Sequence, residues 1–223
     1  MKKEIKAVAF DIDGTLYSDF SLYIRVIPYV LKNLSFFLAF SRVRKILHHT
    51  APLSDFYEYQ ARLLAEELKI SNKAAKEKIE KIVYKGLVPY FTKIKPIRHA
   101  KETLLALKDA GYKIGILSDF PPEQKGTLWG MFNYCDVILG SEACGALKPS
   151  LYPFGILAKE LAVQPEEIVY VGNSIRCDVL GSNNAKMKSA YFMTGWRKIF
   201  NRPLKSAYFS FKNYRQLKNF MLN

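Results

Sequence analysis

The chain has 223 residues, 49% of them hydrophobic and 24% charged, and its formal net charge at neutral pH is +14. This composition suits a folded domain with a sizeable insertion and excludes a low-complexity or intrinsically disordered chain. Cys135, Cys144 and Cys177 are odd in number and lack the spacing of a metal site, so we expect reduced thiols. Because the amino terminus runs directly into the first predicted strand, no signal peptide is expected, and we predict a cytoplasmic protein.

The positive charge is concentrated in two parts of the chain. Residues 1–20 and 96–185 together hold 11 Lys and Arg against 14 Asp and Glu. Residues 21–95 hold 14 against 6, and residues 186–223 hold 9 against none. Such basic regions attract an anionic substrate, nucleic acid or an acidic membrane surface, or they serve only to keep the protein in solution. Composition does not decide between these uses.

Two carboxylates follow the first predicted strand. Ile5 to Phe10 is a short apolar run typical of a buried strand, and Asp11 and Asp13 come directly after it. Gly14 then permits a tight turn. In an open α/β sheet, ligands bind at the carboxyl ends of the strands. The aspartate pair is therefore placed where an active site is expected.

A stretch of about 75 residues with helical patterns interrupts the α/β order after Leu16. Helices are predicted over residues 22–34, 35–49, 56–68 and 71–85, with a return linker over residues 89–96. Residues 22–40 are apolar enough to be considered as a membrane span. Arg25, Pro28 and Lys32 interrupt them, and one charge at the bilayer centre costs about 3 kcal/mol. We therefore expect no transmembrane segment, and predict amphipathic helices that pack on other helices.

Strands and helices alternate through the rest of the chain. Strands are predicted over residues 112–117, 136–139, 168–171, 189–193 and 207–209. Helices are predicted over residues 99–110, 151–161, 178–185 and 214–222, with a short one opening at Pro121. This alternation predicts an α/β fold with a doubly wound parallel sheet.

Four segments carry a family resemblance. Asp11-Ile-Asp-Gly-Thr15 resembles the first motif of the haloacid dehalogenase-like hydrolases, and the strand ending at Ser118-Asp119 resembles the second. Gly145-Ala-Leu-Lys-Pro149 carries the lysine of the third motif, Lys148. Residues 169–174, followed by Asp178, resemble the fourth. The resemblance covers roughly residues 5–20 and 96–195 and implies a Rossmann-like core over residues 1–17 and 93–223. Residues 18–92 then correspond to an inserted helical cap domain of type 1, a mobile lid that sets substrate choice.

The resemblance assigns chemical roles to these positions. It implies that Asp11 is a nucleophile that forms an aspartyl-phosphate, and that Asp13 is the general acid and base. Ser118 and the backbone amide of Asp119 would bind the phosphoryl oxygens. Lys148 would offer a compact cation to the nucleophile and to the group being transferred.

The same resemblance implies a Mg²⁺ cofactor held by Asp11, Asp13, Asn173 and Asp178, with Asp13 contributing its backbone carbonyl. Asn173 departs from the family pattern, which has an acid at this position. An amide oxygen is a ligand for Mg²⁺ but brings no charge, so metal binding is expected to survive and to be weaker. Whether Asn173 or Asp178 contacts the metal directly is left open by the sequence.

The predicted activity is a Mg²⁺-dependent phosphatase acting on a small, anionic, phosphorylated metabolite. Asp13 argues against a dehalogenase, because a halide leaving group needs no proton. A sugar phosphomutase keeps both aspartates and stays an alternative. A catalytically weak protein that binds nucleic acid or another anion through its basic regions is a second alternative from another class. The sequence does not define the substrate or the oligomeric state.

Overall fold

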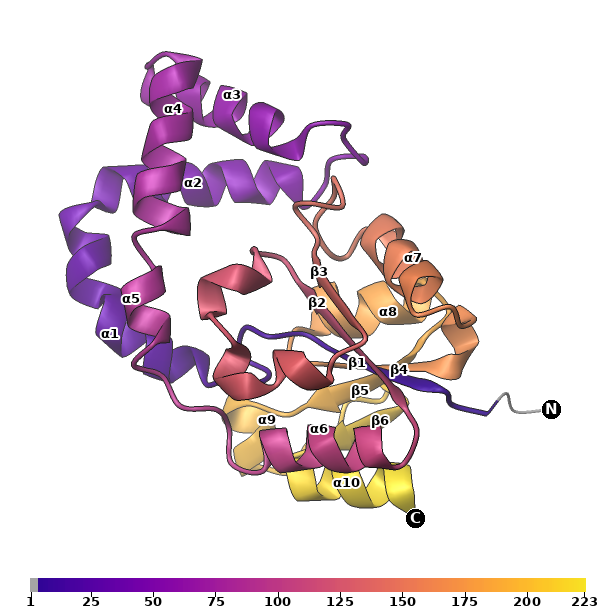
Figure 1. The fold of residues 1–223 in the computed structure, drawn as a ribbon. Coiled ribbons are helices and arrows are strands. Elements are labelled where there is room, and N and C mark those ends of the chain that lie inside the picture. The colour runs from indigo at the N-terminus through magenta and orange to yellow at the C-terminus, as the bar shows by residue number, and fades with distance from the viewer. Residues whose placement is uncertain (1–3) are drawn as a thin grey trace.

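Six parallel strands form one sheet in the computed structural model, which describes residues 4–223 (Figure 1). The strand order is β3-β2-β1-β4-β5-β6, and every neighbouring pair is parallel. The strands are β1 (Ala7–Phe10), β2 (Lys113–Ser118), β3 (Val137–Gly140), β4 (Ile168–Gly172), β5 (Lys188–Phe192) and β6 (Phe209–Phe211). The predicted doubly wound α/β fold is confirmed. The last strand lies two residues later than the predicted 207–209.

Helices cover both faces of the sheet. They are α6 (Ala100–Asp109), α7 (Leu151–Glu160), α8 (Gly181–Asn184) and α10 (Tyr214–Leu222). The short helix α9 (Gly195–Ile199) follows β5 and has no buried residue. Val8 and Phe10 of β1 point into the core layer that contains α6 and α10, whereas Ala7 and Ala9 point into the layer that contains α7. Side chains alternate between the two faces of a strand, so a strand covered on both faces is apolar throughout. This is why residues 7–10 form an uninterrupted apolar run.

The central strand β1 marks the point where the order of the sheet reverses. Phe10 is paired with Ile116 of β2 on one side and with Val171 of β4 on the other. The chain therefore leaves β1 between two strands whose connections run in opposite directions. This is the crevice in which open α/β sheets bind their ligands.

The helical insertion follows β1 and extends beyond the carboxyl edge of the sheet (Figure 1). It contains α1 (Asp19–Lys32), α2 (Leu34–Leu47), α3 (Phe56–Leu68), α4 (Asn72–Ile79) and α5 (Val88–Phe91). The predicted helix over residues 71–85 is not one α-helix, because α4 ends at Ile79 and residues 80–84 form a π-helical turn. The predicted linker contains the short helix α5. The insertion is consistent with the predicted type-1 cap, and its exact limits of 18 and 92 stay a prediction.

The cap has an apolar core of its own, built mainly by α2, α3 and α4, and Leu147 from the α/β core packs into it. A buried ion pair joins the two parts, between Arg44 of α2 and Glu142 after β3. Glu142 also accepts a hydrogen bond from Tyr84, at 2.8 Å. The cap is therefore fixed to the core by polar groups that neither part satisfies alone.

Within residues 4–223, no single helix is long and apolar enough to cross a membrane. The pair α1 and α2 passes the same test of length and composition only when taken together, and these two helices are bent by 114°.

Candidate active site

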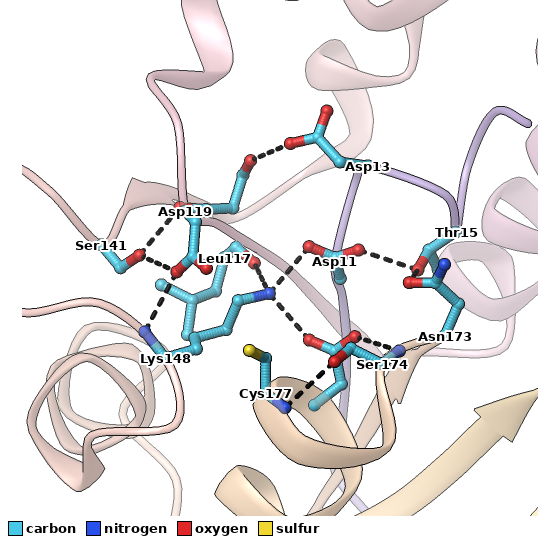
Figure 2. A network of polar contacts seen from close by, with 12 residues as sticks. Asp11, Asp13, Thr15, Leu117, Asp119, Ser141, Lys148, Asn173, Ser174 and Cys177 are labelled. Carbon is cyan, nitrogen blue, oxygen red and sulfur yellow. Dashed lines mark hydrogen bonds and ion pairs between the residues drawn. The ribbon is translucent and has the colours of Figure 1, made fainter. Parts of the chain in front are cut away.

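The polar side chains predicted from the four motifs come together at the carboxyl edge of the sheet (Figure 2). Asp11 follows β1, Ser118 ends β2, and Asn173 follows β4. Because these strands are parallel neighbours in register, their ends lie side by side. The fold therefore gathers residues that are more than 100 positions apart in the sequence.

Lys148 is almost completely enclosed, with an exposed fraction of 2%. Its Nζ lies 2.7 Å from Oδ1 of Asp11 and 2.8 Å from Oδ1 of Asp178. It also donates to the hydroxyl of Tyr170, at 3.2 Å. Burial alone would lower the pKa of Lys148, but the charges of Asp11 and Asp178 outweigh burial and raise this pKa well above its usual value. The lysine is therefore a permanent cation between two carboxylates.

Asp11 is buried beside this cation, and its other oxygen accepts a hydrogen bond from Thr15, at 2.8 Å. Burial raises the pKa of Asp11 to about 8, because desolvation and the nearby Asp178 and Asp13 together oppose the attraction of Lys148. A nucleophilic carboxylate must be ionised. A bound cation next to Asp11 would supply the missing stabilisation of its charge.

Asp13 has a different environment from Asp11. It accepts hydrogen bonds from Tyr17, from Ser118 at 3.2 Å and from Lys125 at 3.3 Å. Burial alone would raise the pKa of Asp13, but Lys125 and the hydroxyl donors bring it below its ordinary value. Two carboxylates separated by one residue thus have pKa values shifted in opposite directions, upward for Asp11 and downward for Asp13. An ionised nucleophile and a protonated acid need the reverse order, which a cation beside Asp11 and an anionic substrate beside Asp13 would favour.

Asp119 holds the loop of the third motif in place. Its Oδ1 accepts hydrogen bonds from Ser141 at 2.6 Å and from the backbone amide of Lys148 at 3.0 Å (Figure 2). The side chain therefore fixes the start of the segment from which Lys148 reaches Asp11. The predicted use of the Asp119 backbone amide as a phosphate donor stays a prediction.

Asn173 and Asp178 of the fourth motif occupy different positions in the site. The side-chain oxygen of Asn173 lies 3.3 Å from the Thr15 hydroxyl, on the side of Asp11 opposite Lys148 (Figure 2). Asp178 is fully engaged, because one oxygen binds Lys148 and the other accepts from the Ser174 amide at 2.8 Å. Asp178 thus orients Lys148.

Two glycines allow these side chains to approach. A Cβ on Gly172 would lie 2.3 Å from the Cβ of Asp178, so only glycine lets the end of β4 pack against this carboxylate. Gly14 has a φ of +76°, and a Cβ there would lie 2.2 Å from the amide nitrogen of Asn173. A side chain at either position would push the fourth motif away from Asp11.

The side chains at the Asn173 end of the site fit a Mg²⁺ ion. The Asp11 carboxylate, the Thr15 hydroxyl and the Asn173 amide oxygen form a continuous row, with 2.8 Å and 3.3 Å between neighbouring oxygens. All three are hard oxygen donors, the type that Mg²⁺ prefers. Nitrogen and sulfur ligands are absent from this row, which argues against a zinc site.

Three residues of the site were missed by the sequence motifs. Lys125 lies on a 3₁₀ turn after β2, and its side chain is almost completely buried against Asp13. Tyr170 is a core residue of β4 whose hydroxyl contacts Lys148. Asp19 begins α1 and accepts a weak hydrogen bond from Asn173, at 3.4 Å. Burial, followed by the charge of Asp13, raises the pKa of Asp19 to about 6. No spacing rule connects these residues to the motifs, because only the folded chain brings them near.

Comparison with known proteins identifies the family. The model of the haloacid dehalogenase-like hydrolases matches residues 5–186. The chain belongs to this family. This confirms the predicted superfamily and the predicted enzyme class, a hydrolase.

Relatives and solved structures agree with this assignment. A glyceraldehyde 3-phosphate phosphatase from Methanothermobacter thermautotrophicus is 27% identical over 192 residues, covering 83% of this chain and 84% of that protein. The crystal structure of a phosphatase of the same superfamily from Thermococcus onnurineus has a TM-score of 0.67 at 23% identity, with 98% of each chain covered. The magnesium-bound hydrolase YfnB from Bacillus subtilis has a TM-score of 0.68 at 13% identity, covering 98% of this chain and 99% of that one. At these identities the two solved structures establish the fold.

Proposed function

We propose that this hydrolase is a Mg²⁺-dependent phosphatase that removes the phosphoryl group of a small metabolite through an aspartyl-phosphate on Asp11. The observation that carries the proposal is the placement of two carboxylates after the central strand, each held by a buried lysine, Asp11 by Lys148 and Asp13 by Lys125. Lys148 holds Asp11 at 2.7 Å, and Ser118 reaches Asp13 from the neighbouring strand. A phosphate monoester needs this set, a nucleophile, a proton donor and fixed positive charge.

In the first step, an oxygen of Asp11 attacks phosphorus and the bond between phosphorus and the leaving oxygen breaks. Asp13 gives its proton to that leaving oxygen. The low pKa of Asp13 describes the protein without substrate, in which Lys125 and Tyr17 face the carboxylate. An arriving phosphate dianion places negative charge beside Asp13 and favours uptake of the proton that is then transferred.

In the second step, water attacks the phosphorus of the aspartyl-phosphate, and the bond to the Asp11 oxygen breaks. Asp13, now ionised, accepts the proton of the water, and inorganic phosphate leaves. Lys148 keeps its contact with Asp11 in both steps and balances the charge of the departing carboxylate. Ser118 and the Asp119 amide are proposed to hold the phosphoryl oxygens at the end of β2.

Asp11, the backbone carbonyl of Asp13 and Asn173 are proposed to hold the Mg²⁺ ion. Bound there, the ion supplies positive charge that neutralises the phosphoryl oxygens and keeps Asp11 ionised. Asp178 is assigned to positioning Lys148, because one of its oxygens lies 2.8 Å from Nζ of Lys148 and the other accepts from the Ser174 amide, whereas Asn173 belongs to the row of oxygens with Asp11 and Thr15. This proposal decides the alternative that the sequence left open in favour of Asn173.

A small phosphorylated sugar or acid is the proposed substrate class. The support comes from relatives that are phosphatases for glyceraldehyde 3-phosphate, three of which match over more than four fifths of this chain. The cap adds further support, because a closed lid admits only a small ligand. A sugar phosphomutase stays the second candidate, since it uses the same two aspartates.

The test measures inorganic phosphate released from a panel of phosphorylated metabolites, with Mg²⁺ and with a chelator. We expect release that needs Mg²⁺ and is lost in Asp11→Asn. Denaturing mass spectrometry of a rapidly quenched reaction should show one added phosphoryl group on wild type and none on the variant. Isomerised sugar phosphate without free phosphate would instead establish a mutase. Nucleic-acid binding without turnover of any substrate would establish the binding protein.

A further inference from the structure

The helix α1 is apolar on two opposite sides. One side faces the protein, where Val26 is buried and Leu22 and Tyr29 pack against the two hydrophobic cores. The opposite side carries four large apolar residues spaced as one stripe along the helix, and these are 52–72% exposed: Phe20, Ile24, Ile27 and Leu31. The apolar side of a surface helix normally faces the protein core, so a second apolar side on the same helix is unusual. Something other than the described chain is therefore expected to cover this stripe.

Exposed apolar residues also occur past the bend of 114° between α1 and α2. Leu34 and Leu38 lie one turn apart on α2 and are about half exposed. Inside the cap, only the opposite side of α2 is used, where Phe36, Phe40 and Val43 are buried. We call the six exposed residues the outer stripe: Phe20, Ile24, Ile27, Leu31, Leu34 and Leu38. Scattered exposed apolar residues are ordinary, but six of them on the outward sides of two consecutive helices mark a contact surface.

The segment that carries the outer stripe has charges of one sign. No Asp or Glu occurs from residue 20 to residue 54, a segment that holds five Lys and Arg. Arg44 is buried against Glu142 and Arg42 is paired with Glu67 of α3, so the exposed cations without such a pair are Arg25, Lys32 and Lys45. Arg25 and Lys32 are seven residues apart and therefore flank the stripe on the same side of α1. The surface is thus apolar along its middle and positive beside it.

A second exposed patch, also apolar with basic neighbours, lies at the carboxyl edge of the sheet, from which the cap extends. It belongs to α9, which follows the carboxyl end of β5, just as α1 follows that of β1 (Figure 1). Trp196, Ile199 and Phe200 are 58–76% exposed, and Arg197 and Lys198 stand between them. Residues 186–223 contain no acid at all. Tryptophan with basic neighbours is typical of the interface between a bilayer and water.

We propose that the outer stripe docks on the surface of an anionic lipid bilayer, with α1 lying in the plane of the interface. Apolar side chains would enter the boundary between headgroups and acyl chains, while the flanking lysines and arginines contact lipid phosphates. A second copy of the chain fits this surface poorly. A twofold contact would bring the same acid-free, positive segment against itself, so that like charges face each other.

The experiment is flotation of the whole protein with vesicles of phosphatidylcholine alone or with about a quarter of phosphatidylglycerol. Wild type should float with the anionic vesicles, and high salt should weaken the binding. The exposed Trp196 gives a second readout, a blue shift of its fluorescence on binding. Ile27→Glu combined with Leu31→Glu should lower the partition coefficient at least about tenfold, because two apolar contacts are lost and two negative charges are added.

The matched control is Leu151→Glu combined with Leu222→Glu. These residues are also exposed leucines, at the start of α7 and in α10, and the change in net charge is the same. The control should bind far more tightly than the stripe variant. Arg25→Gln combined with Lys32→Gln should weaken binding to anionic vesicles about fivefold for each charge and leave the weak binding to neutral vesicles unchanged. An unchanged melting temperature shows that a variant is folded. If the stripe variant is not folded, the variant Arg25→Gln with Lys32→Gln still tests the proposal.

Three results would overturn the proposal. One is the absence of wild-type binding to either kind of vesicle. Another is an equal loss of binding in the stripe variant and its control. The third is a lipid-free dimer, seen by light scattering, that only the stripe variant dissociates, because the covering surface is then a second copy. None of these results depends on whether the enzyme is a phosphatase.

Discussion

The catalytic edge of the sheet and the helical cap use charge in opposite ways. At the sheet edge, Lys148 is almost completely buried between two carboxylates, and the oxygens of Asp178 are both engaged. In the cap, most charges face solvent, and large apolar side chains of α1 do so as well. Buried paired charges fix a geometry to within a hydrogen bond, whereas exposed charges leave a surface free for partners. The core thus fixes the geometry of the candidate active site, whereas the cap leaves charged and apolar side chains accessible to other molecules.

The strongest test of this contrast removes the nucleophile. Asp11→Asn preserves the shape of the side chain and its hydrogen bond from Thr15, so the protein should remain folded. Turnover should fall by about 10⁴-fold or more, because the covalent route is lost. Phosphate release from the best substrate of the panel measures the effect. Changing Lys45, an exposed charge of the cap, to Gln serves as the contrast and should alter kcat less than about threefold. A folded Asp11→Asn protein with wild-type turnover would refute the covalent mechanism.

The free energy of unfolding should depend strongly on Lys148, the buried cation of the catalytic edge. Lys148→Met leaves Asp11 and Asp178 facing each other without a counter-charge, and the loss of one partner from such a buried set costs about 3–5 kcal/mol. We expect the free energy of unfolding, measured by urea titration without metal, to fall by about this amount. Adding Asp178→Asn to the variant should recover part of it. If the single variant is as stable as wild type, the lysine is not held as the structure shows.

Arg44 of the cap differs from the exposed charges around it, because it forms a buried ion pair with Glu142 of the core. Arg44→Met should destabilise the protein by about 3 kcal/mol, since it leaves Glu142 buried without its cation. The double variant Arg44→Met with Glu142→Gln should be closer to wild type. Thermal or urea unfolding measures both. An additive double variant would show that the two residues do not interact.

How far the sequence predicts this molecule differs between the two regions. The apolar run before Asp11 and the strands before Ser118 and Asn173 predict both the parallel sheet and the meeting of these residues, because strand ends in one sheet lie together. Lys125 and Tyr170 carry no such signal, since their contacts depend on the turn after β2 and on side-chain length. The π-helical turn at residues 80–84 was also missed, because the sequence keeps a helical pattern through it.

The cap shows the limit of pattern reading. Periodicity predicts that residues 22–49 form helices, and it predicts that an apolar side packs inward. It does not reveal that α1 has a second apolar side that no part of the described chain covers, because exposure is a property of the packed structure. Likewise, the count of charges locates the basic regions but does not show that Arg44 is buried and that its neighbour Lys45 is exposed.

The pH should act on the catalytic edge through Asp11. Its pKa of about 8 lies above the ordinary carboxyl range, so Asp11 is mostly protonated at neutral pH in the metal-free protein. Bound Mg²⁺ requires the ionised form, and binding therefore releases a proton. Affinity for Mg²⁺, measured by calorimetry, should rise by up to about tenfold for each pH unit below 8 and level off above it. The raised pKa also means that the metal-free protein loses stability as the pH rises from about 4 towards 8. A flat affinity profile would show that Asp11 is already ionised.

The smallest expected effect is a change in Mg²⁺ affinity that depends on Asn173 and its neighbour Asp19. Two unit charges about 4 Å apart interact by roughly 4 kcal/mol at an effective dielectric near 20, so Asn173→Asp should strengthen Mg²⁺ binding. Desolvation and repulsion from Asp11 offset much of this gain, and we expect about a tenfold lower Mg²⁺ midpoint, near 1.4 kcal/mol. Asp19 reduces the gain further, because it accepts a hydrogen bond from the amide nitrogen that the substitution removes.

The structure therefore supplies a sharper variant, Asn173→Asp combined with Asp19→Asn. This exchange keeps the net charge of the pair and restores a donor opposite the new carboxylate. If Asn173 faces the ion and Asp19 lies behind it, the exchange should bind Mg²⁺ at least as tightly as Asn173→Asp alone, and Asp19→Asn alone should change the midpoint little. Activity against Mg²⁺ concentration at one pH and saturating substrate gives all four midpoints, and calorimetry checks them without turnover. Equal midpoints in wild type and Asn173→Asp would mean that Asp178, and not the residue at position 173, binds the metal. A large loss of Mg²⁺ affinity in Asp19→Asn alone would mean that the cap itself, through the first residue of α1, contributes charge to the metal site.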